Sequence, residues 1–256
     1  MSRRAAVALA VAALLAGSPA RAERLVVSLS SSLVAIGSNF TGARLVAFGV
    51  IERDGQTASR SGPYDVVVTT RGPRELVTVR RKEQLGPIWL NRSQQKFVQV
   101  PSYLAVMSSR PVPDLASDVM RQRFRLGIDA VVNAPEFSIE GAREGEPFRN
   151  ALVRLKGRDR LYVENPRAVT FVSGEFFRTA IPLPATAPVG NYEVEVSLVA
   201  DGIVLSRQNA SFELVKTGIE EQITEFARER PALSGFTTAA IALVFGWVAS
   251  VIFRRD

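Results

Sequence analysis

Short apolar runs, many of them alternating with polar residues, predict β-strands along the first part of the chain. They are separated by turn signals such as Asp54-Gly55 and Arg71-Gly72-Pro73. Six or seven short strands with turns roughly every 8 to 12 residues are typical of an antiparallel β-sandwich. We therefore predict a β-sandwich domain over residues 23–111.

The apolar spacing becomes helical in the middle of the chain. Leu115 and Val119 lie four positions apart in a stretch of helix-forming residues. Behind Glu146-Pro147, a suitable first turn, apolar residues return at helical spacing, namely Phe148, Ala151, Leu152 and Leu155. These patterns predict a helical insert over residues 112–161.

Strict alternation resumes after the predicted insert. Between Tyr192 and Leu198 every second residue is apolar, which places the apolar side chains on the core face and Glu193 and Glu195 on the solvated face. Asp201-Gly202 is a hairpin turn signal. We predict a second sandwich-like β region over residues 162–216, which either folds separately or shares sheets with residues 23–111.

One tyrosine in this region suggests a particular sandwich. Tyr192 enters its strand after the turn Pro188-Val189-Gly190-Asn191, as does the tyrosine corner of immunoglobulin-like domains. An ordinary hairpin in another β fold explains the same residues. The expected fold class is therefore mainly β with a helical insert, built on one or two immunoglobulin-like antiparallel β-sandwich domains.

The end of the chain carries a long uncharged segment. Residues 232–253 contain no charged residue and are followed by Arg254 and Arg255. A helix of this length spans roughly 33 Å, enough for a hydrocarbon core of about 30 Å, and the two arginines fit the positive-inside rule. We predict a transmembrane helix over residues 232–253, a cytoplasmic tail over 254–256, and a juxtamembrane helix over 217–231.

The N-terminus has the three parts of a secretory signal peptide. Arg3 and Arg4 precede an apolar run from Ala5 to Ala16, and Ala20-Arg21-Ala22 is a small-x-small cleavage pattern. We predict a signal peptide over residues 1–22, with an uncleaved N-terminal anchor as the alternative. In both cases the folded part would lie in the periplasm and the C-terminus in the cytoplasm. With the signal peptide cleaved, the protein would be single-pass in the bacterial inner membrane.

Composition narrows the range of functions. The formal charge of +7 falls to about +3 for the predicted ectodomain, because the signal peptide and the tail hold five of the arginines and one aspartate. Its basic residues are scattered, so no nucleic-acid partner is expected. The sequence contains no cysteine and no histidine, which excludes Ser-His-Asp and Cys-His catalysis as well as Cys/His metal sites. We expect no cofactor and no metal.

Two groups of charged residues have the chemistry of a binding site. The arginines of the helical middle could bind an oxyanion through their guanidinium groups, or could simply be a solvated helix face, namely Arg121, Arg123, Arg125, Arg154, Arg158 and Arg160. Glu140, Glu144 and Glu146 share a Gly-rich loop whose spacing matches no known calcium loop. We therefore interpret the loop as a solvated acidic turn before a helix, with an oxygen-rich cation site as the alternative.

The predicted membrane helix has a face of small residues. Ala242, Gly246 and Ser250 recur every four positions, a spacing that allows two helices to approach closely. A plain anchor that has no helix partner would also contain small residues. We interpret these three residues as a candidate helix-association face.

Several motifs together resemble one protein family. They include Ile36-Gly37-Ser38-Asn39-Phe40-Thr41-Gly42, Pro101-Ser102-Tyr103, Phe176-Phe177-Arg178, Lys216-Thr217-Gly218 and Gly246-Trp247. The chain resembles the alphaproteobacterial putative transmembrane protein family over nearly all of its mature length. The resemblance implies an inner-membrane protein, often encoded near sulfite-exporter-type permeases. It implies no particular activity and brings no catalytic or binding residues.

These observations favour an inner-membrane-anchored periplasmic interaction or accessory protein that is not an enzyme and is associated with a transporter. A membrane-protein partner, such as a sulfite-exporter-type permease, is expected. The alternative is an anion-binding subunit of an exporter that takes sulfite or a sulfonate. A hydrolase that uses carboxylates alone would need a facing acidic pair, which the sequence does not indicate.

Overall fold

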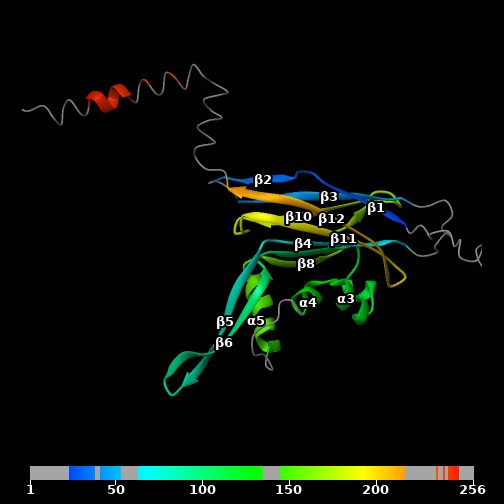
Figure 1. The fold of residues 1–256 in the computed structure, drawn as a ribbon, viewed down its shortest axis with the longest axis horizontal. Helices are drawn as coiled ribbons and strands as arrows, with labels where there is room; N and C mark the ends of the chain where they lie inside the picture. Colours follow the sequence, from blue (N-terminus) through cyan, green and yellow to red (C-terminus); the bar gives the residue numbers. More distant parts are fainter. Residues whose placement is uncertain are drawn as a thin grey trace, which may run out of the picture.

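Strands make up most of the regular structure in the computed structural model. The structure describes residues 23–37, 41–52, 63–134 and 145–216, together with Gly235, Ala239 and residues 242–247. Within these ranges the chain forms two main sheets, a projecting β-hairpin and a group of short helices (Figure 1). The prediction of a mainly β protein is confirmed.

The first sheet has four strands, all antiparallel. Their order is β1 (Arg24–Leu29), β3 (Gly42–Glu52), β10 (Phe176–Pro184) and β9 (Thr170–Phe171). Buried and exposed residues alternate along β3 and β10. This sheet therefore turns one face to the core and the other to the surface.

The second sheet has six strands. Their order is β2 (Leu33–Ile36), β12 (Ile203–Lys216), β11 (Gly190–Ala200), β4 (Asp65–Arg71), β7 (Leu104–Ser108) and β8 (Tyr162–Pro166). β2 runs parallel to β12, and β8 runs parallel to β7. The expectation of purely antiparallel pairing is wrong for these two pairs. The helical insert connects β7 to β8, and such a crossover brings the chain back parallel.

Both main sheets combine strands from the two predicted β regions. β3 from the first region pairs with β10 from the second, and β4 pairs with β11. The boundaries 23–111 and 162–216 therefore do not separate two sheet systems. Residues of both regions share a single hydrophobic core.

That core lies between the two sheets. The four-stranded sheet contributes Leu45, Ile51, Phe177, Ile181 and Leu183, all of them buried. The facing strands of the six-stranded sheet contribute Val66, Val68, Val194, Val196 and Leu198, also buried. Burying one such side chain stabilises the fold by about 1.5–3 kcal/mol, so this layer supplies most of the driving force for association of the sheets.

Tyrosine hydroxyls anchor turns at the edge of the core. Tyr192 donates a hydrogen bond to the carbonyl oxygen of Pro188 at 2.6 Å, four residues upstream, which is the geometry of a tyrosine corner. Its ring stacks on Phe212 with 4.9 Å between centroids. Tyr103 donates to the carbonyl of Pro182 on the opposite sheet. Burial raises the pKa of Tyr103 and Tyr192 above the ordinary value, so both hydroxyls remain protonated donors.

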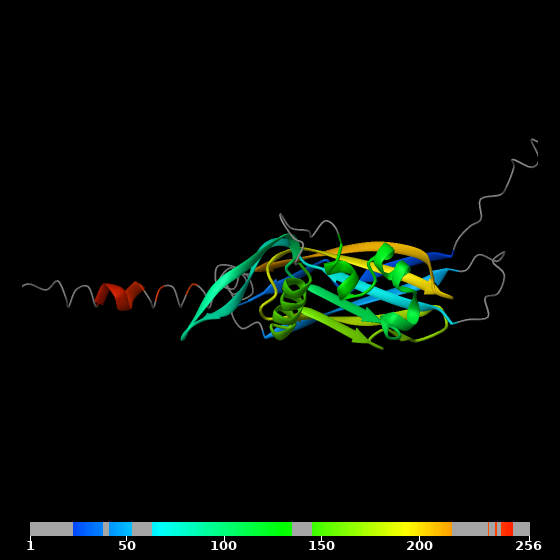
Figure 2. The same cartoon turned by 90° about the horizontal axis from the view of Figure 1, so that it is seen from below.

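The predicted helical insert is present and forms a third layer. It consists of α2 (Val112–Leu115), α3 (Asp118–Phe124), α4 (Ile128–Val132) and α5 (Gly145–Arg158), with residues 135–144 outside the described part. These helices lie over the outer face of the six-stranded sheet (Figure 2). As a result β4 and β7 are buried on both faces, Val67, Leu104 and Val106 included.

A long hairpin leaves the body between β4 and β7. β5 (Arg74–Leu85) and β6 (Ile88–Pro101) pair antiparallel around a two-residue turn in which Gly86 has a φ of 62°. Near the base, Val79, Phe97 and Val100 are buried, and Lys156 of α5 forms an ion pair with Glu75. Beyond this base the hairpin extends past the sheets (Figure 1).

Candidate functional site

The structure places part of the predicted helix-association face. Residues 242–247 are helical, and Ala242 and Gly246 are exposed there, whereas Ser250 lies outside the described residues. Within the described part of the chain, no helix combines the length and the apolar character that crossing a membrane requires. The predicted signal peptide (1–22), juxtamembrane helix (217–231) and tail (254–256) lie outside the described residues, as does most of 232–253.

The arginines singled out in the helical region do not all converge. Arg154 and Arg158 are exposed on α5, and Arg160 lines a separate cavity beside Gly42 and Pro182. Arg121 forms an ion pair with Asp118 one turn earlier in α3. Only Arg123 and Arg125 of the six face one cavity, of about 660 Å³, between α3, α4 and α5.

A further arginine, not singled out in the sequence, completes this cavity. Arg149 of α5 lines it together with Gln122 and Asn133. The Nη1 of Arg149 donates to the Asn133 Oδ1 at 3.3 Å. Its Nε is buried and has no hydrogen-bond partner in the part of the chain that the structure describes. We call Arg123, Arg125, Arg149, Gln122 and Asn133 the arginine pocket.

Local backbone geometry explains why the arginine pocket forms. Arg125 caps α3 in the left-handed conformation, with a φ of 55°, and its amide donates to the carbonyls of Arg121 and Gln122. Gly127, with a φ of 96°, then turns the chain into α4. Glu164 of β8 accepts a hydrogen bond from the Ile128 amide at 3.1 Å and holds the start of α4. Guanidinium donors from two helices thereby face a common space suited to an oxyanion.

The acidic residues have different positions from those expected. Glu146 lies exposed on the first turn of α5 and borders the arginine pocket, while Glu140 and Glu144 fall outside the described residues. Glu193 is exposed as predicted. Among the described residues, no group of three or more His, Cys, Asp or Glu side chains could hold a metal ion.

Glu195 contradicts the prediction of a solvated carboxylate. It is buried on the outer face of the six-stranded sheet, where Arg71 Nη1 contacts its Oε2 at 2.8 Å and Arg207 Nη2 contacts its Oε1 at 2.5 Å. The Arg207 guanidinium also lies 5.8 Å from the ring centroid of Phe124 in α3. The prediction was wrong because the helical insert covers this face of β11.

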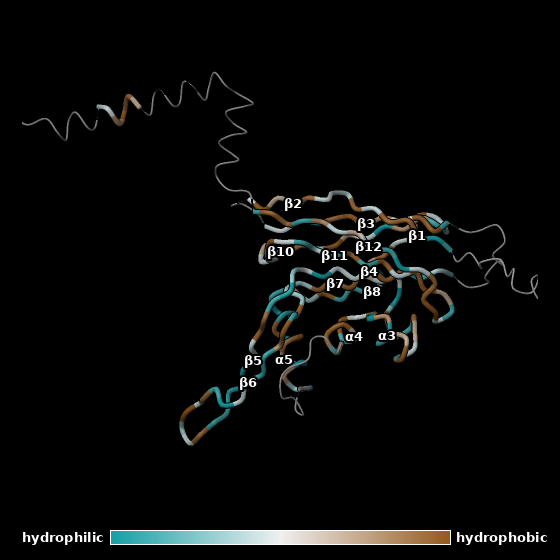
Figure 3. The backbone as a smooth tube through the Cα atoms, viewed as in Figure 1, coloured by the Kyte–Doolittle hydropathy of each residue, from teal (hydrophilic) through white to brown (hydrophobic). Residues whose placement is uncertain are grey.

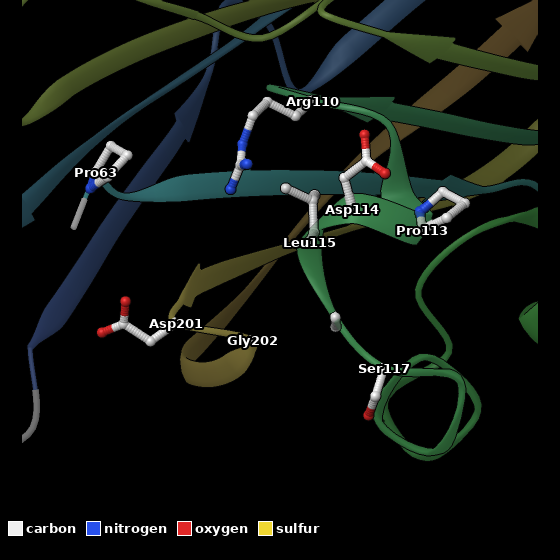
Figure 4. Close-up of a pocket in the computed structure, with 9 residues that line it drawn as sticks. Pro63, Arg110, Pro113, Asp114, Leu115, Ser117, Asp201 and Gly202 are labelled. Carbon is white, nitrogen blue, oxygen red and sulfur yellow. The ribbon is translucent and has the colours of Figure 1, made fainter.

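Another cavity, of about 410 Å³, lies beside α2 and the turn between β11 and β12 (Figure 4). Its most prominent polar side chain is Arg110, which donates from Nε to Asp65 Oδ1 at 3.0 Å and forms an ion pair with the same carboxylate. This hydrogen bond raises the pKa of Arg110 above its ordinary value. Because the charge is paired with Asp65, a structural role explains this arginine.

The tip of the β5–β6 hairpin carries four exposed large apolar side chains within six residues. Leu85, Ile88, Trp89 and Leu90 are 57%, 53%, 63% and 45% exposed. We call residues 85–90 the hairpin tip. Figure 3 shows hydrophobic residues at this tip, next to a hydrophilic section of both strands. Apolar clusters that remain exposed in a folded protein are typical of interaction surfaces.

The family comparison covers the folded body and the C-terminal segment together. The family model described as "Putative transmembrane protein (Alph_Pro_TM)" matches residues 24–255. The chain belongs to this family. Membership confirms the resemblance stated from the motifs, and it fits a membrane location for the Alph_Pro_TM protein. No curated protein and no solved structure matches the chain.

Two features of this Alph_Pro_TM family member were not predicted from its sequence. Arg149 lies one residue after the buried Phe148 of α5, so helical spacing could have placed it beside the insert's core. The run Leu85-Gly86-Pro87-Ile88-Trp89-Leu90 combines a turn signal with apolar flanks, which could have indicated an exposed hairpin tip.

Proposed function

We propose that this protein is a non-enzymatic accessory protein of the bacterial inner membrane, with its folded body in the periplasm. The observation that carries the proposal is the match to a transmembrane family model from residue 24 to residue 255. This range includes both the β body and the uncharged segment 232–253. The arginines after that segment and the signal-like N-terminus support the same orientation.

The body is proposed to be an immunoglobulin-like sandwich with two insertions. The order β1-β3-β10-β9 corresponds to A-B-E-D of such domains, and β12-β11-β4-β7 corresponds to G-F-C-C′. The parallel pairing of β2 with β12 fits a first strand that divides between the two sheets. The tyrosine corner at Tyr192 lies at the start of the strand equivalent to F. Such domains commonly serve as scaffolds for protein contacts, which is an argument by analogy.

The partner is proposed to be an integral membrane protein that contacts the small-residue face. A transporter of the sulfite-exporter type is the candidate that the family resemblance implies. Close approach of two helices needs small side chains at the contact, as Ala242, Gly246 and Ser250 provide. The folded body would then be held beside the partner's periplasmic surface.

Co-purification from crosslinked membranes at native expression tests this proposal. The wild-type chain should recover a membrane protein, and Gly246→Leu should abolish that recovery because the larger side chain separates the helices. Val244→Ala, about 160° around the helix from Gly246, is the matched control and should leave recovery unchanged. Both variants must stay in alkali-washed membranes. Recovery of the chain alone, or equal recovery by Gly246→Leu, would count against the proposed partner.

The arginine pocket favours a second candidate function, an anion-binding subunit for sulfite or a sulfonate. Arg123, Arg125 and Arg149 line one cavity of about 660 Å³, and the buried Nε of Arg149 has no partner among the described residues. A planar guanidinium group pairs well with the oxygens of such anions. An anion in this cavity would accept hydrogen bonds from the guanidinium groups that line it.

Calorimetry of the purified chain with sulfite, sulfate and small sulfonates tests the second candidate. Saturable binding should weaken about ten- to a hundredfold in Arg149→Ala, because a hydrogen bond to a charged group contributes about 1.5–3 kcal/mol. Arg154→Ala, an exposed arginine on the same helix, is the control and should bind normally. No heat with any of these anions would remove this candidate.

A further inference from the structure

We propose that the hairpin tip inserts into the interfacial layer of a bilayer that contains anionic head groups, giving the folded body a second contact with the membrane. The proposal rests on the proposed membrane anchoring, because the bilayer concerned is the one that would hold residues 232–253. It adds a lipid-binding site in the β5–β6 hairpin, far in sequence from that segment.

The side chains of the tip suit the boundary between water and lipid. Trp89 is mostly exposed, and Leu85, Ile88 and Leu90 beside it are exposed as well. Tryptophan is enriched at membrane interfaces, because its ring is apolar and its indole N–H is polar. The tip is a narrow turn at the end of two strands, so it can enter a lipid layer without exposing further backbone.

Four basic residues lie on the two strands next to the hairpin tip, and we call them the basic collar. Arg80, Arg81 and Lys82 lie on β5 and Arg92 lies on β6, all exposed. The one acidic residue between them, Glu83, accepts a hydrogen bond from Ser93 Oγ at 2.7 Å and lies 3.8 Å from the Nε of Arg81. Four basic residues and one carboxylate leave the collar with a net positive charge. Lys82 lies three residues from Leu85, about 10 Å along a strand. With the tip among the acyl chains, these cations would lie at the level of the head groups, where anionic lipids attract them.

The strand register shows that the hairpin begins at the same end of the folded body as the last residues of β12, after which the chain continues to residue 217. Leu214 of β12 pairs with Gly190 at the start of β11, and Glu193 pairs with Arg71 at the end of β4. The hairpin begins at Arg74, and Gly190 lies against Pro73 at its base. The last residues of β12 and the root of the hairpin therefore occupy one end of the six-stranded sheet, and the hairpin extends outward there in both views (Figures 1 and 2).

The hairpin and the segment of residues 217–231 are both long enough to reach one membrane surface. β5 has twelve residues and is about 40 Å long. Residues 217–231 separate β12 from the uncharged segment and would reach about 22 Å as a helix or up to about 50 Å when extended. A bilayer that starts near residue 232 is thus within reach of the hairpin tip.

Size and charge favour lipid over a protein as the occupant. A stable protein interface buries about 800 Å² on each partner, which exceeds what a six-residue turn offers. A collar that combines arginine and lysine around an apolar tip matches anionic head groups above acyl chains. A protein partner or a second copy of the chain remains a distinguishable outcome of the test.

Fluorescence of Trp89 in the full-length protein tests the proposal. The sequence has two tryptophans, so Trp247→Phe leaves Trp89 as the only one. The variant is reconstituted in vesicles of phosphatidylcholine with phosphatidylglycerol. We expect a blue-shifted emission, loss of quenching by aqueous acrylamide, and strong quenching by lipids brominated near the head-group end of the acyl chain. Vesicles of phosphatidylcholine alone should weaken all three effects.

Flotation of the same vesicles separates the two proposals. If the protein floats but Trp89 emits as in water and ignores brominated lipids, hairpin insertion is refuted while the anchoring stands. If the protein does not float and Trp89 remains in water, both are refuted. Protection of Trp89 from acrylamide without quenching by brominated lipids would mean a protein contact and overturn the lipid proposal.

Ile88→Ser with Leu90→Ser, at exposed positions, should abolish the quenching and leave flotation intact.

Discussion

Replacing Glu195 with alanine is expected to lower the free energy of unfolding by about 3 kcal/mol. Removal of one partner from a buried ion pair costs about 3–5 kcal/mol, because the opposite charge remains buried without compensation. We take the lower end of this range, since Arg207 is only partly covered and can turn to solvent. Urea unfolding of the purified chain, followed by circular dichroism, measures the change.

The position of Arg71 explains why the loss should be large. Its side chain is 16% exposed, that of Glu195 is 9% exposed, and the two atoms in contact lie 2.8 Å apart. Arg71 ends β4, next to the root of the hairpin, and its backbone is held by pairing with Glu193 of β11. In Glu195→Ala the mostly buried charge of Arg71 would lose the carboxylate that compensates it.

Glu193→Ala is the matched control for this experiment. Glu193 lies two residues earlier on the same face of β11, but it is exposed. Its loss should change the stability by no more than about 0.5 kcal/mol, as is usual for a surface position. Equal effects of the two substitutions, or a stable Glu195→Ala protein, would show that the Arg71–Glu195–Arg207 cluster does not stabilise the fold.

Glu195 also shows where the sequence ceases to be informative. Alternation of apolar and polar residues correctly separated the two faces of β11, with Val194 and Val196 in the core. Alternation says nothing of what covers the second face. In this protein the covering side chains include Phe124 of α3 in the helical insert, far earlier in the chain, so a carboxylate on the polar face is buried and paired.

Strand pairing likewise depends on contacts between distant segments. The strands, the helical insert and the hairpin turn at Asp201-Gly202 follow from local patterns, and they are present. The pairing of β3 with β10 joins residues more than 120 positions apart, and no local pattern determines it. β8 pairs parallel to β7 because of the path that the helical insert takes between these two strands, and hydrophobic periodicity alone does not define that path.

The candidate site could be predicted only in part for the same reason. The sequence identifies arginines as oxyanion donors, but Arg123 and Arg149 meet only because α3 and α5 pack around one cavity. Arg154 and Arg158 belong to the same group of six arginines in the helical region, but they are exposed on α5 instead. Which arginines converge is decided by helix packing, which depends on the sheet below.

Gly49→Ala is expected to destabilise the protein by about 2 kcal/mol. Gly49 lies at the centre of β3, opposite Phe177 of β10. A Cβ there would lie 2.6 Å from Phe177 Cζ and 2.7 Å from the carbonyl oxygen of Val26 in β1. Such overpacking costs about 1–3 kcal/mol, whereas removing a glycine from a strand gains only about 0.5–1 kcal/mol. The steric cost exceeds the gain because both neighbouring strands would have to move.

The Phe177 ring is one of the two obstacles, beside the carbonyl oxygen of Val26. The ring is fully buried, and its centroid lies 6.0 Å from that of Phe171 in an edge-on arrangement. Phe177→Leu removes the ring atoms that a new Cβ would strike and leaves the Val26 oxygen, so the double variant with Gly49→Ala should lose less stability than the two single changes predict together. Gly174→Ala is the control, since a Cβ there meets nothing within 4 Å, and it should unfold like the wild type. If Gly49→Ala and Gly174→Ala unfold at the same urea concentration, the ring does not fill the space above β3 as described.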